Sequence, residues 1–240
     1  MQAKHFENYR SFDIERQSIV IPLDVMITGV TGAGKSTTLN TLFEKEVAKV
    51  GTGSNPETME LGCYQLSDWL RLWDTPGLGD SPEKDKNHKK RMIQLLDKTW
   101  KSDFEIFGFI DLAIVIIEGS KRDLGTTIKL LEDVILPHIE SDRVLVAINQ
   151  ADVAMKGRNW DEAKNQPNDV LLNYLEEFAI SLRKRIYKDT KLRIPKPIYY
   201  SAERGYNIEA FLDLIIDHIP TQKRVSHVFQ TVKEIIKSWM

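Results

Sequence analysis

One stretch of eight residues constrains the fold of this 240-residue chain more than any other: Gly29-Val30-Thr31-Gly32-Ala33-Gly34-Lys35-Ser36. It fits the pattern G-x-x-x-x-G-K-[ST], in which glycines let backbone N–H groups curl around a polyphosphate without a Cβ in the way. An apolar run over 22–28 precedes it and predicts a buried strand, and leucine and phenylalanine at helical spacing over 35–46 follow it. This order of strand, glycine loop and helix predicts a phosphate-binding loop, and we favour it over a loop that is merely flexible.

The polar residues of this loop have predicted tasks. The Lys35 ammonium would reach the β- and γ-phosphates, and the Ser36 hydroxyl would ligate Mg²⁺. The positions predicted to contact the nucleotide here are Gly29, Thr31, Gly32, Ala33, Gly34, Lys35, Ser36 and Thr37.

Composition narrows the class of protein. A hydrophobic content of 42% is enough for a sizeable core, and a formal net charge of −2 gives no global attraction to polyanions. Cys63 is the only cysteine, which excludes an internal disulfide, and the five histidines show no zinc-ligand spacing. The longest aliphatic run, around 114–117, is too short to span a bilayer, and 1–17 is polar. We therefore expect a cytoplasmic protein without a transmembrane segment.

Strands and helices alternate along the rest of the chain. The expected strands cover 22–28, 61–66, 69–73, 110–118, 143–148 and 198–200, and the expected helices cover 35–46, part of 78–102, 123–138, 168–187 and 207–219. The helix within 78–102 is expected to carry Met92, Leu95, Leu96 and Trp100. This pattern predicts a three-layer α/β fold with a mostly parallel six-stranded sheet, one antiparallel edge strand and ligand binding at the carboxyl ends of the strands.

Three segments follow from this assignment: an N-terminal flanking segment over 1–19, the α/β domain over 20–220, and a C-terminal amphipathic helix over 221–240. For the last helix we favour packing on the same domain over docking or dimerisation. For the phenylalanines just before the strand over 110–118, we likewise favour core packing over a partner surface.

A second motif, Asp74-Thr75-Pro76-Gly77, follows the strand over 69–73. Alone, this sequence indicates only a turn. Placed 39 residues after Lys35 and at the end of a second strand, it supplies a carboxylate beside Mg²⁺ and a glycine N–H for a γ-phosphate.

Two further loops are expected to select the base. A carboxylate at Asp152 would accept from guanine N1–H and the exocyclic amine, whereas adenine presents a lone pair at N1. Asn149 precedes it in Asn149-Gln150-Ala151-Asp152, and the backbone N–H of Ala202 would donate to guanine O6. The residues assigned to the base are Asn149, Gln150, Asp152, Ser201, Ala202 and Glu203.

Taken together, these motifs resemble those of P-loop GTPases of the translation-factor class, of the Era-like kind. The resemblance covers most of the chain and is greatest with bacterial ribosome-binding-GTPase-like proteins; the loop is also similar to that of immunity-related GTPases. It implies a G domain that binds GTP or GDP with Mg²⁺ and hydrolyses GTP, with segments 47–60 and 77–102 as switches. It also implies catalytic roles for Lys35, Thr58 and Gly77, and metal contacts for Ser36, Thr58 and Asp74, with Thr52 and Ser54 as competing candidates for the Thr58 role.

The chain departs from the family pattern at three positions. Leu78 stands where Ras-like members have a glutamine that orients water, so we expect slow intrinsic hydrolysis. Gly32 replaces the asparagine of potassium-activated relatives, which argues against potassium dependence. Gln150 replaces the usual lysine, which predicts a weaker grip on guanine.

Three functions stay open at this point. The first is a GTP-hydrolysing switch that acts on an unknown protein effector, and the second is a module that forms homodimers in response to GTP. The third is RNA or ribosome association through a basic tract with an aromatic residue inside it. The tract consists of Arg183, Lys184, Arg185, Lys188, Lys191, Arg193 and Lys196, with Tyr187 among them.

Overall fold

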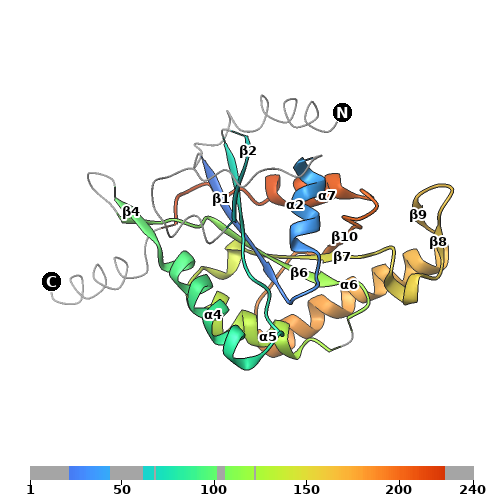
Figure 1. Ribbon diagram of the computed structural model, residues 1–240, viewed down its shortest axis with the longest axis horizontal. Helices are drawn as coiled ribbons and strands as arrows, with labels where there is room; N and C mark the ends of the chain where they lie inside the picture. Colours follow the sequence, from blue (N-terminus) through green and yellow to red (C-terminus); the bar gives the residue numbers. More distant parts are fainter. Residues whose placement is uncertain (1–21, 44–61, 68, 102–105, 122, 225–240) are drawn as a thin grey trace.

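The computed structural model describes residues 22–43, 62–67, 69–101, 106–121 and 123–224 (Figure 1). The expected flanking segment over 1–19 lies outside these residues, as do Thr58, its competitors Thr52 and Ser54, and all but the first four residues of the expected C-terminal helix. Among the described helices, none combines the length and apolar character that crossing a membrane requires.

A six-stranded sheet forms the centre of the molecule, in the order β10-β7-β6-β1-β3-β2. Its strands are β1 (Leu23–Gly29), β2 (Gly62–Ser67), β3 (Leu70–Asp74), β6 (Leu112–Glu118), β7 (Val144–Asn149) and β10 (Ile198–Tyr199). All neighbours pair in parallel except the edge strand β2, which runs antiparallel to β3. The predicted mostly parallel sheet with one antiparallel edge strand is confirmed.

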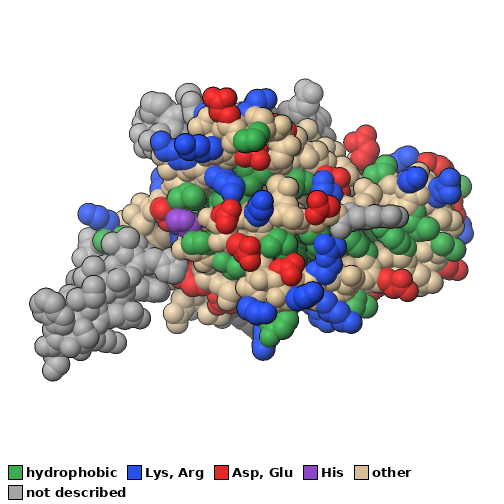
Figure 2. Space-filling view, turned by 90° about the horizontal axis from the view of Figure 1, so that it is seen from below, with side chains coloured by type: hydrophobic (Ala, Val, Ile, Leu, Met, Phe, Trp, Pro, Cys, Tyr) green, Lys and Arg blue, Asp and Glu red, His purple; other side chains and the backbone are tan. Residues whose placement is uncertain are grey.

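Helices cover both faces of the sheet (Figure 1). Helices α2 (Lys35–Phe43) and α7 (Ile208–Ile216) pack on one face, and α4 (Pro82–Asp97), α5 (Gly125–Leu130) and α6 (Asp169–Thr190) pack on the other. Because successive side chains of a strand point to opposite faces, Val25 and Ile27 of β1 join the core under α2 and α7, whereas Met26 joins the core under α4. Figure 2 looks onto the α4, α5 and α6 face, which is charged and has hydrophobic atoms scattered over it.

The strand register places the loops that carry function side by side. Ile27 of β1 lies opposite Asp74 of β3, Gly29 lies opposite Ile116 of β6, and Glu118 lies opposite Asn149 of β7. The carboxyl ends of four neighbouring strands therefore meet at one edge of the sheet, and both phosphate and base motifs leave from it.

Two local expectations need correction, and one element was not predicted. Trp100 does not continue the helix, because α4 ends at Asp97 and Lys98 is extended. Trp100 lies instead in β4 (Thr99–Lys101), which pairs with β5 (Ile106–Gly108). The Trp100 ring stacks on the Phe107 ring, with 4.8 Å between their centres. The helix expected over 123–138 is α5 followed by a π-helical turn over Leu131–Ile135. A short hairpin of β8 (Trp160–Asp161) and β9 (Gln166–Pro167) was not predicted, since two-residue strands leave no alternation to detect.

Polar contacts fasten the last described residues to the amino edge of the sheet. Lys223 donates to Asp111 at 3.3 Å, and the buried Arg224 donates to the carbonyl oxygens of His138, at 2.6 Å, and of Leu96. The Arg224 backbone oxygen also accepts from Gly108 at 2.7 Å. Residues 223 and 224 are therefore packed against the domain.

Candidate functional site

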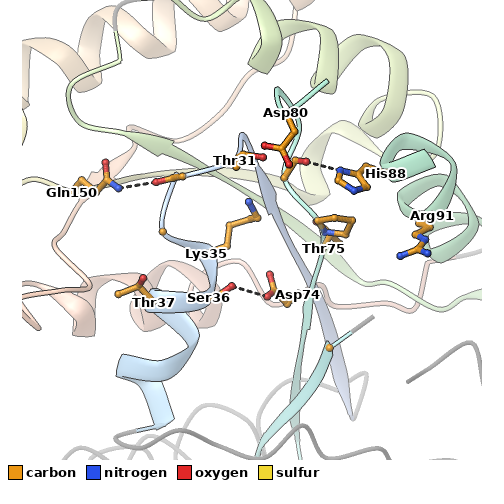
Figure 3. Close-up of a pocket in the computed structure, with 15 residues that line it drawn as sticks. Thr31, Lys35, Ser36, Thr37, Asp74, Thr75, Asp80, His88, Arg91 and Gln150 are labelled. Carbon is orange, nitrogen blue, oxygen red and sulfur yellow. Dashed lines mark hydrogen bonds between the residues drawn. The ribbon is translucent and has the colours of Figure 1, made fainter. Parts of the chain in front are cut away.

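A cavity of about 570 Å³ opens at the carboxyl edge of the sheet, between the glycine loop, the end of β3 and the start of α4 (Figure 3). The glycine loop and α2 contribute Thr31, Gly32, Gly34, Lys35, Ser36 and Thr37. The opposite wall comes from β2, the 74–80 segment, α4 and the loop after β7, with Gly62, Asp74, Thr75, Pro76, Gly77, Asp80, His88, Arg91 and Gln150. The structure thus brings the two predicted phosphate motifs to one cavity.

Lys35 is the buried cation of this cavity, with 8% of its surface exposed. Its ammonium donates to the carbonyl oxygens of Val30 at 3.0 Å and Gly29 at 3.4 Å. Burial lowers the pKa of the Lys35 ammonium, and the carboxylates of Asp74 and Asp80 offset only part of that shift. An anion placed in the cavity would stabilise the charged form, so the site favours a ligand such as a phosphate.

The predicted metal residues Ser36 and Asp74 are in contact. The Ser36 hydroxyl donates to an Asp74 carboxylate oxygen at 3.0 Å (Figure 3). A hydroxyl with a carboxylate directly behind it fits Mg²⁺, which takes few protein ligands and completes its shell with water and phosphate oxygens. The described residues contain no group of three or more His, Cys, Asp or Glu side chains that could hold a metal ion.

The segment after Asp74 lies directly on the glycine loop. Thr31 N–H donates to Leu78 O at 2.8 Å, and Leu78 N–H donates to Gly29 O at 3.3 Å. A Cβ on Gly77 would come within 2.6 Å of Thr31 backbone atoms, so this approach requires glycine. The Leu78 side chain is buried at 1% exposure in the core and is withdrawn from the cavity.

Two side chains of α4 hold this segment from the other side. His88 Nδ1 lies 2.8 Å from Gly77 O, and because a carbonyl oxygen only accepts, Nδ1 carries the proton. One turn earlier, the Asp85 carboxylate accepts from Gly79 N–H at 2.9 Å. Helix α4 thus forms hydrogen bonds with both Gly77 and Gly79, on either side of Leu78, in the turn that would face a γ-phosphate.

Asn149 joins the phosphate loop to the base-selecting loops. Its amide nitrogen donates to Ala33 O at 3.0 Å, and its amide oxygen accepts from Ala202 N–H at 3.0 Å. A Cβ on Gly34, whose φ is +80°, would lie 2.3 Å from that amide nitrogen. Glycine at position 34 therefore serves the close approach of Asn149 as well as the turn.

Gln150 takes the position after Asn149 with a φ of 62°, an uncommon backbone conformation for a residue other than glycine. Its amide donates to Gly32 O at 2.8 Å, across the mouth of the cavity (Figure 3). The Gln150 side chain therefore links the loop after β7 to the glycine loop.

Asp152 is the group that would select the base. It is 7% exposed, and its Oδ1 atom has no hydrogen-bond partner among the described residues. Its other oxygen, Oδ2, lies 3.8 Å from the Arg204 guanidinium. Arg204 also donates two hydrogen bonds of 3.0 Å to the carboxylate of Glu162, between β8 and β9. A buried acceptor without a donor is costly, and a ligand or a water molecule that donates to it would remove that cost.

The Ser201-Ala202-Glu203 loop differs from expectation in one respect. The Ala202 N–H, predicted to donate to the base, donates to Asn149 in this structure. The Ser201 hydroxyl accepts from Arg204 N–H at 3.2 Å, and the Glu203 side chain is exposed. The loop also accepts a hydrogen bond at Ala202 O from Thr41 of α2 at 2.7 Å, which ties it to the helix that follows the phosphate loop.

Sequence reasoning missed four polar residues around these sites: Asp80, His88, Arg91 and Arg204. The first three belong to a polar stretch with no motif. His88 and Arg91 reach the cavity because they lie on α4, whereas Asp80 lies in the segment between β3 and α4. Arg204 directly follows the predicted Ser201-Ala202-Glu203. Its proximity to Asp152 follows once β10 is known to pair with β7, because both loops then leave neighbouring strands.

With this geometry established, comparison with known proteins identifies the family. Residues 24–184 match the family model described as 50S ribosome-binding GTPase. The chain belongs to this family. It is a G-domain protein, and the predicted family resemblance is confirmed.

Relatives extend the similarity. The chain is 25% identical over 213 residues to mouse (Mus musculus) Interferon-inducible GTPase 1, a match that covers 84% of this chain and 45% of that protein. It is 33% identical over 85 residues to mouse Interferon-gamma-inducible GTPase 10, covering 33% of this chain and 19% of that protein. These two matches cover less than half of either protein's length.

Solved structures share the fold. Toc33 from Arabidopsis thaliana, with Mg²⁺ and GMPPNP, has a TM-score of 0.58 at 15% identity and covers 94% of both chains. Era, with MgGDPNP and a 16S ribosomal RNA segment, has a TM-score of 0.52 at 17% identity, covering 84% of this chain and 58% of that one. The three-layer G-domain architecture is therefore the same in all three.

Replacing Asn149 with alanine should destabilise the nucleotide-free chain by about 2 kcal/mol, because the Ala33 carbonyl and the Ala202 N–H both lose a buried partner. Urea unfolding in EDTA, after nucleotide removal, measures this directly. Gln150→Ala is the matched control, since its amide makes one partly exposed contact, and it should cost less than about 1 kcal/mol. Equal losses in the two variants would contradict the bridging role.

Proposed function

We propose that this chain binds GTP and GDP together with Mg²⁺, hydrolyses GTP to GDP and phosphate, and acts as a nucleotide-dependent switch. The observation that carries the proposal is the unpaired buried oxygen of Asp152 at the same sheet edge as the phosphate loop. A guanine base presents two N–H donors to a carboxylate, whereas adenine presents a lone pair, so the buried acceptor suits guanine.

The polyphosphate would bind along the loop between Gly29 and Ser36. Lys35 already faces two carbonyl oxygens in a buried setting, and phosphate oxygens are stronger partners for its ammonium. Ser36 and Asp74 would hold Mg²⁺, directly and from behind respectively, and Thr58 is proposed as a further ligand. Bound Mg²⁺ would neutralise charge that develops on the β- and γ-phosphate oxygens.

Hydrolysis by the isolated chain should be slow. In Ras-like GTPases, a glutamine at the position of Leu78 orients the attacking water. Leu78 is apolar and buried in the core, so it cannot do so. Among the described residues, the proposed contributions are charge stabilisation by Lys35 and positioning by Gly77 and its anchor His88. We therefore propose that a partner, a protein effector or a second copy of the chain, accelerates turnover.

Gly77 would serve as the sensor of the γ-phosphate. Its N–H belongs to a turn that contacts the glycine loop on one side and α4 on the other. A γ-phosphate entering beside Gly77 would change both contacts, which is how nucleotide state would reach α4. Nucleotide-dependent dimerisation and RNA or ribosome binding, the alternatives from the sequence, stay predictions.

The direct test compares nucleotide-stripped wild-type chain with Lys35→Ala. Wild type should bind a fluorescent GTP analogue in Mg²⁺ and release phosphate on the order of 10⁻³ s⁻¹ or slower. Lys35→Ala should lose both properties, because the buried ammonium supplies the charge for the phosphates. Absence of binding in wild type, or equal turnover in both chains, would refute the proposal.

Asp152→Asn should shift preference from guanine to xanthine nucleotides by at least about tenfold. An amide in this position replaces one acceptor by a donor, which matches the carbonyl of xanthine. Competition binding with GDP and XDP measures the ratio. Asp142→Asn, an exposed acid at the amino edge, is the control and should leave the ratio unchanged.

His88→Ala should lower kcat for GTP by roughly tenfold with little change in GTP affinity, because the Gly77 carbonyl loses its anchor while the phosphate loop stays intact. His88→Asn places an amide donor near the position of Nδ1 and should restore most of the rate. Asn87→Ala, an exposed neighbour on α4, is the control. Equal rates for His88→Ala and His88→Asn would exclude this positioning role.

A further inference from the structure

A second cavity, of about 430 Å³, lies at the C-terminal end of α6. It is lined by Arg183, Lys184, Tyr187, Leu192, Arg193 and Ile194. Helix α6 returns from the carboxyl edge of the sheet to the start of β10, so its last turn lies at the amino edge. This cavity is therefore at the amino edge of the sheet, whereas the proposed GTP site is at the carboxyl edge.

The walls of this cavity are fixed by a defined chain reversal. Lys191 ends α6 in the left-handed conformation, with a φ of 61°, and its N–H donates to Tyr187 O at 3.0 Å. The Thr190 hydroxyl donates to Ile186 O at 2.8 Å and accepts from Leu192 N–H at 3.1 Å. These bonds hold the segment after the helix back against its last two turns.

The floor of the cavity is apolar and the rim is cationic. Leu192 and Ile194 are anchored in the core at 2% and 7% exposure, and Tyr187 beside them is 43% exposed. Arg193, between the two buried residues, is exposed, and its guanidinium carbon lies 5.6 Å from the centre of the Tyr187 ring. The result is an aromatic and aliphatic surface with planar guanidinium groups at its border.

The three cations of the rim are available for a ligand. None of Arg183, Lys184 and Arg193 forms an ion pair with any residue that the structure describes, whereas nearby Lys196 is paired with Glu176 at 2.7 Å. The segment 183–196 holds seven Lys or Arg residues and one Asp in a chain whose net charge is −2. The potential here is thus locally positive and points to an anionic ligand.

We propose that this cavity binds a nucleoside phosphate, with the base on the exposed Tyr187 ring above the buried Leu192 and Ile194, and the phosphate on the rim cations. The unit would come either as a free nucleotide or as part of a single-stranded RNA. A duplex hides its base faces, an acidic peptide brings charge without a planar apolar surface, and a flat membrane surface does not enter a concavity. The proposal is independent of the ligand that occupies the first site.

The test measures fluorescence anisotropy of a labelled short oligouridylate with the full chain, which is first loaded with GDP and Mg²⁺ and then freed of unbound nucleotide. The first site is then filled, and no free GDP competes for the second cavity. Unlabelled UMP, poly-glutamate and anionic phospholipid vesicles are the competitors. Tyr187→Ala should weaken binding at least about fivefold through loss of stacking, and Tyr187→Phe should retain it. Arg193→Ala should weaken binding and reduce its salt dependence. Lys129→Ala, an exposed cation on α5, is the matched control and should have no effect.

The outcomes separate the sources of the ligand. Competition by UMP at concentrations similar to those of its oligomer identifies a free nucleotide, whereas much weaker competition by UMP identifies single-stranded RNA. The proposal is wrong if neither probe binds, if Tyr187→Ala binds like wild type, or if Lys129→Ala weakens binding as much as Arg193→Ala. Stronger competition by poly-glutamate or by vesicles than by either nucleotide probe would assign the cavity to a different partner.

Discussion

The carboxyl edge of the sheet works as one site because the Asn149 side chain spans it. Its amide holds the phosphate loop at Ala33 and the 201–203 loop at Ala202, with both distances at 3.0 Å. The Thr41 hydroxyl adds a second link to the same loop from α2, at the Ala202 carbonyl. A buried amide with both ends satisfied thus sets the distance between the place for a phosphate and the place for a base.

The site also contains two buried polar groups whose charge or hydrogen-bonding capacity is not fully compensated by the folded chain. Burial lowers the pKa of the Lys35 ammonium, and one oxygen of Asp152 has no donor among the described residues. Both groups reduce the stability of the ligand-free chain. Their opposite signs are matched to the two ends of a nucleotide, since the polyphosphate is an anion and the guanine edge is a set of donors. Unfavourable burial of this kind is typical of binding sites.

Sequence patterns predicted the sheet and the nucleotide motifs for physical reasons that apply locally. Buried parallel strands such as β6 are continuous apolar runs, and Gly34 and Gly77 stand where a Cβ would collide with Asn149 or Thr31. Contacts between distant segments were not accessible in the same way. His88 approaches Gly77 only because α4 folds back over the loop, and Trp100 leaves the helix because it pairs with Phe107 across a short hairpin. The donation of Ala202 N–H to Asn149 likewise depends on three-dimensional packing that no spacing encodes.

Helix α4 forms polar contacts with two separate parts of the chain, the turn at Gly77–Gly79 and Arg224. Near its start, His88 and Asp85 hold the turn beside the cavity, and at its end Leu96 accepts from the buried Arg224. With 16 residues, α4 is a rod of about 24 Å. The same helix therefore borders the proposed place of a γ-phosphate through His88 and contacts the last described residue, Arg224, through Leu96.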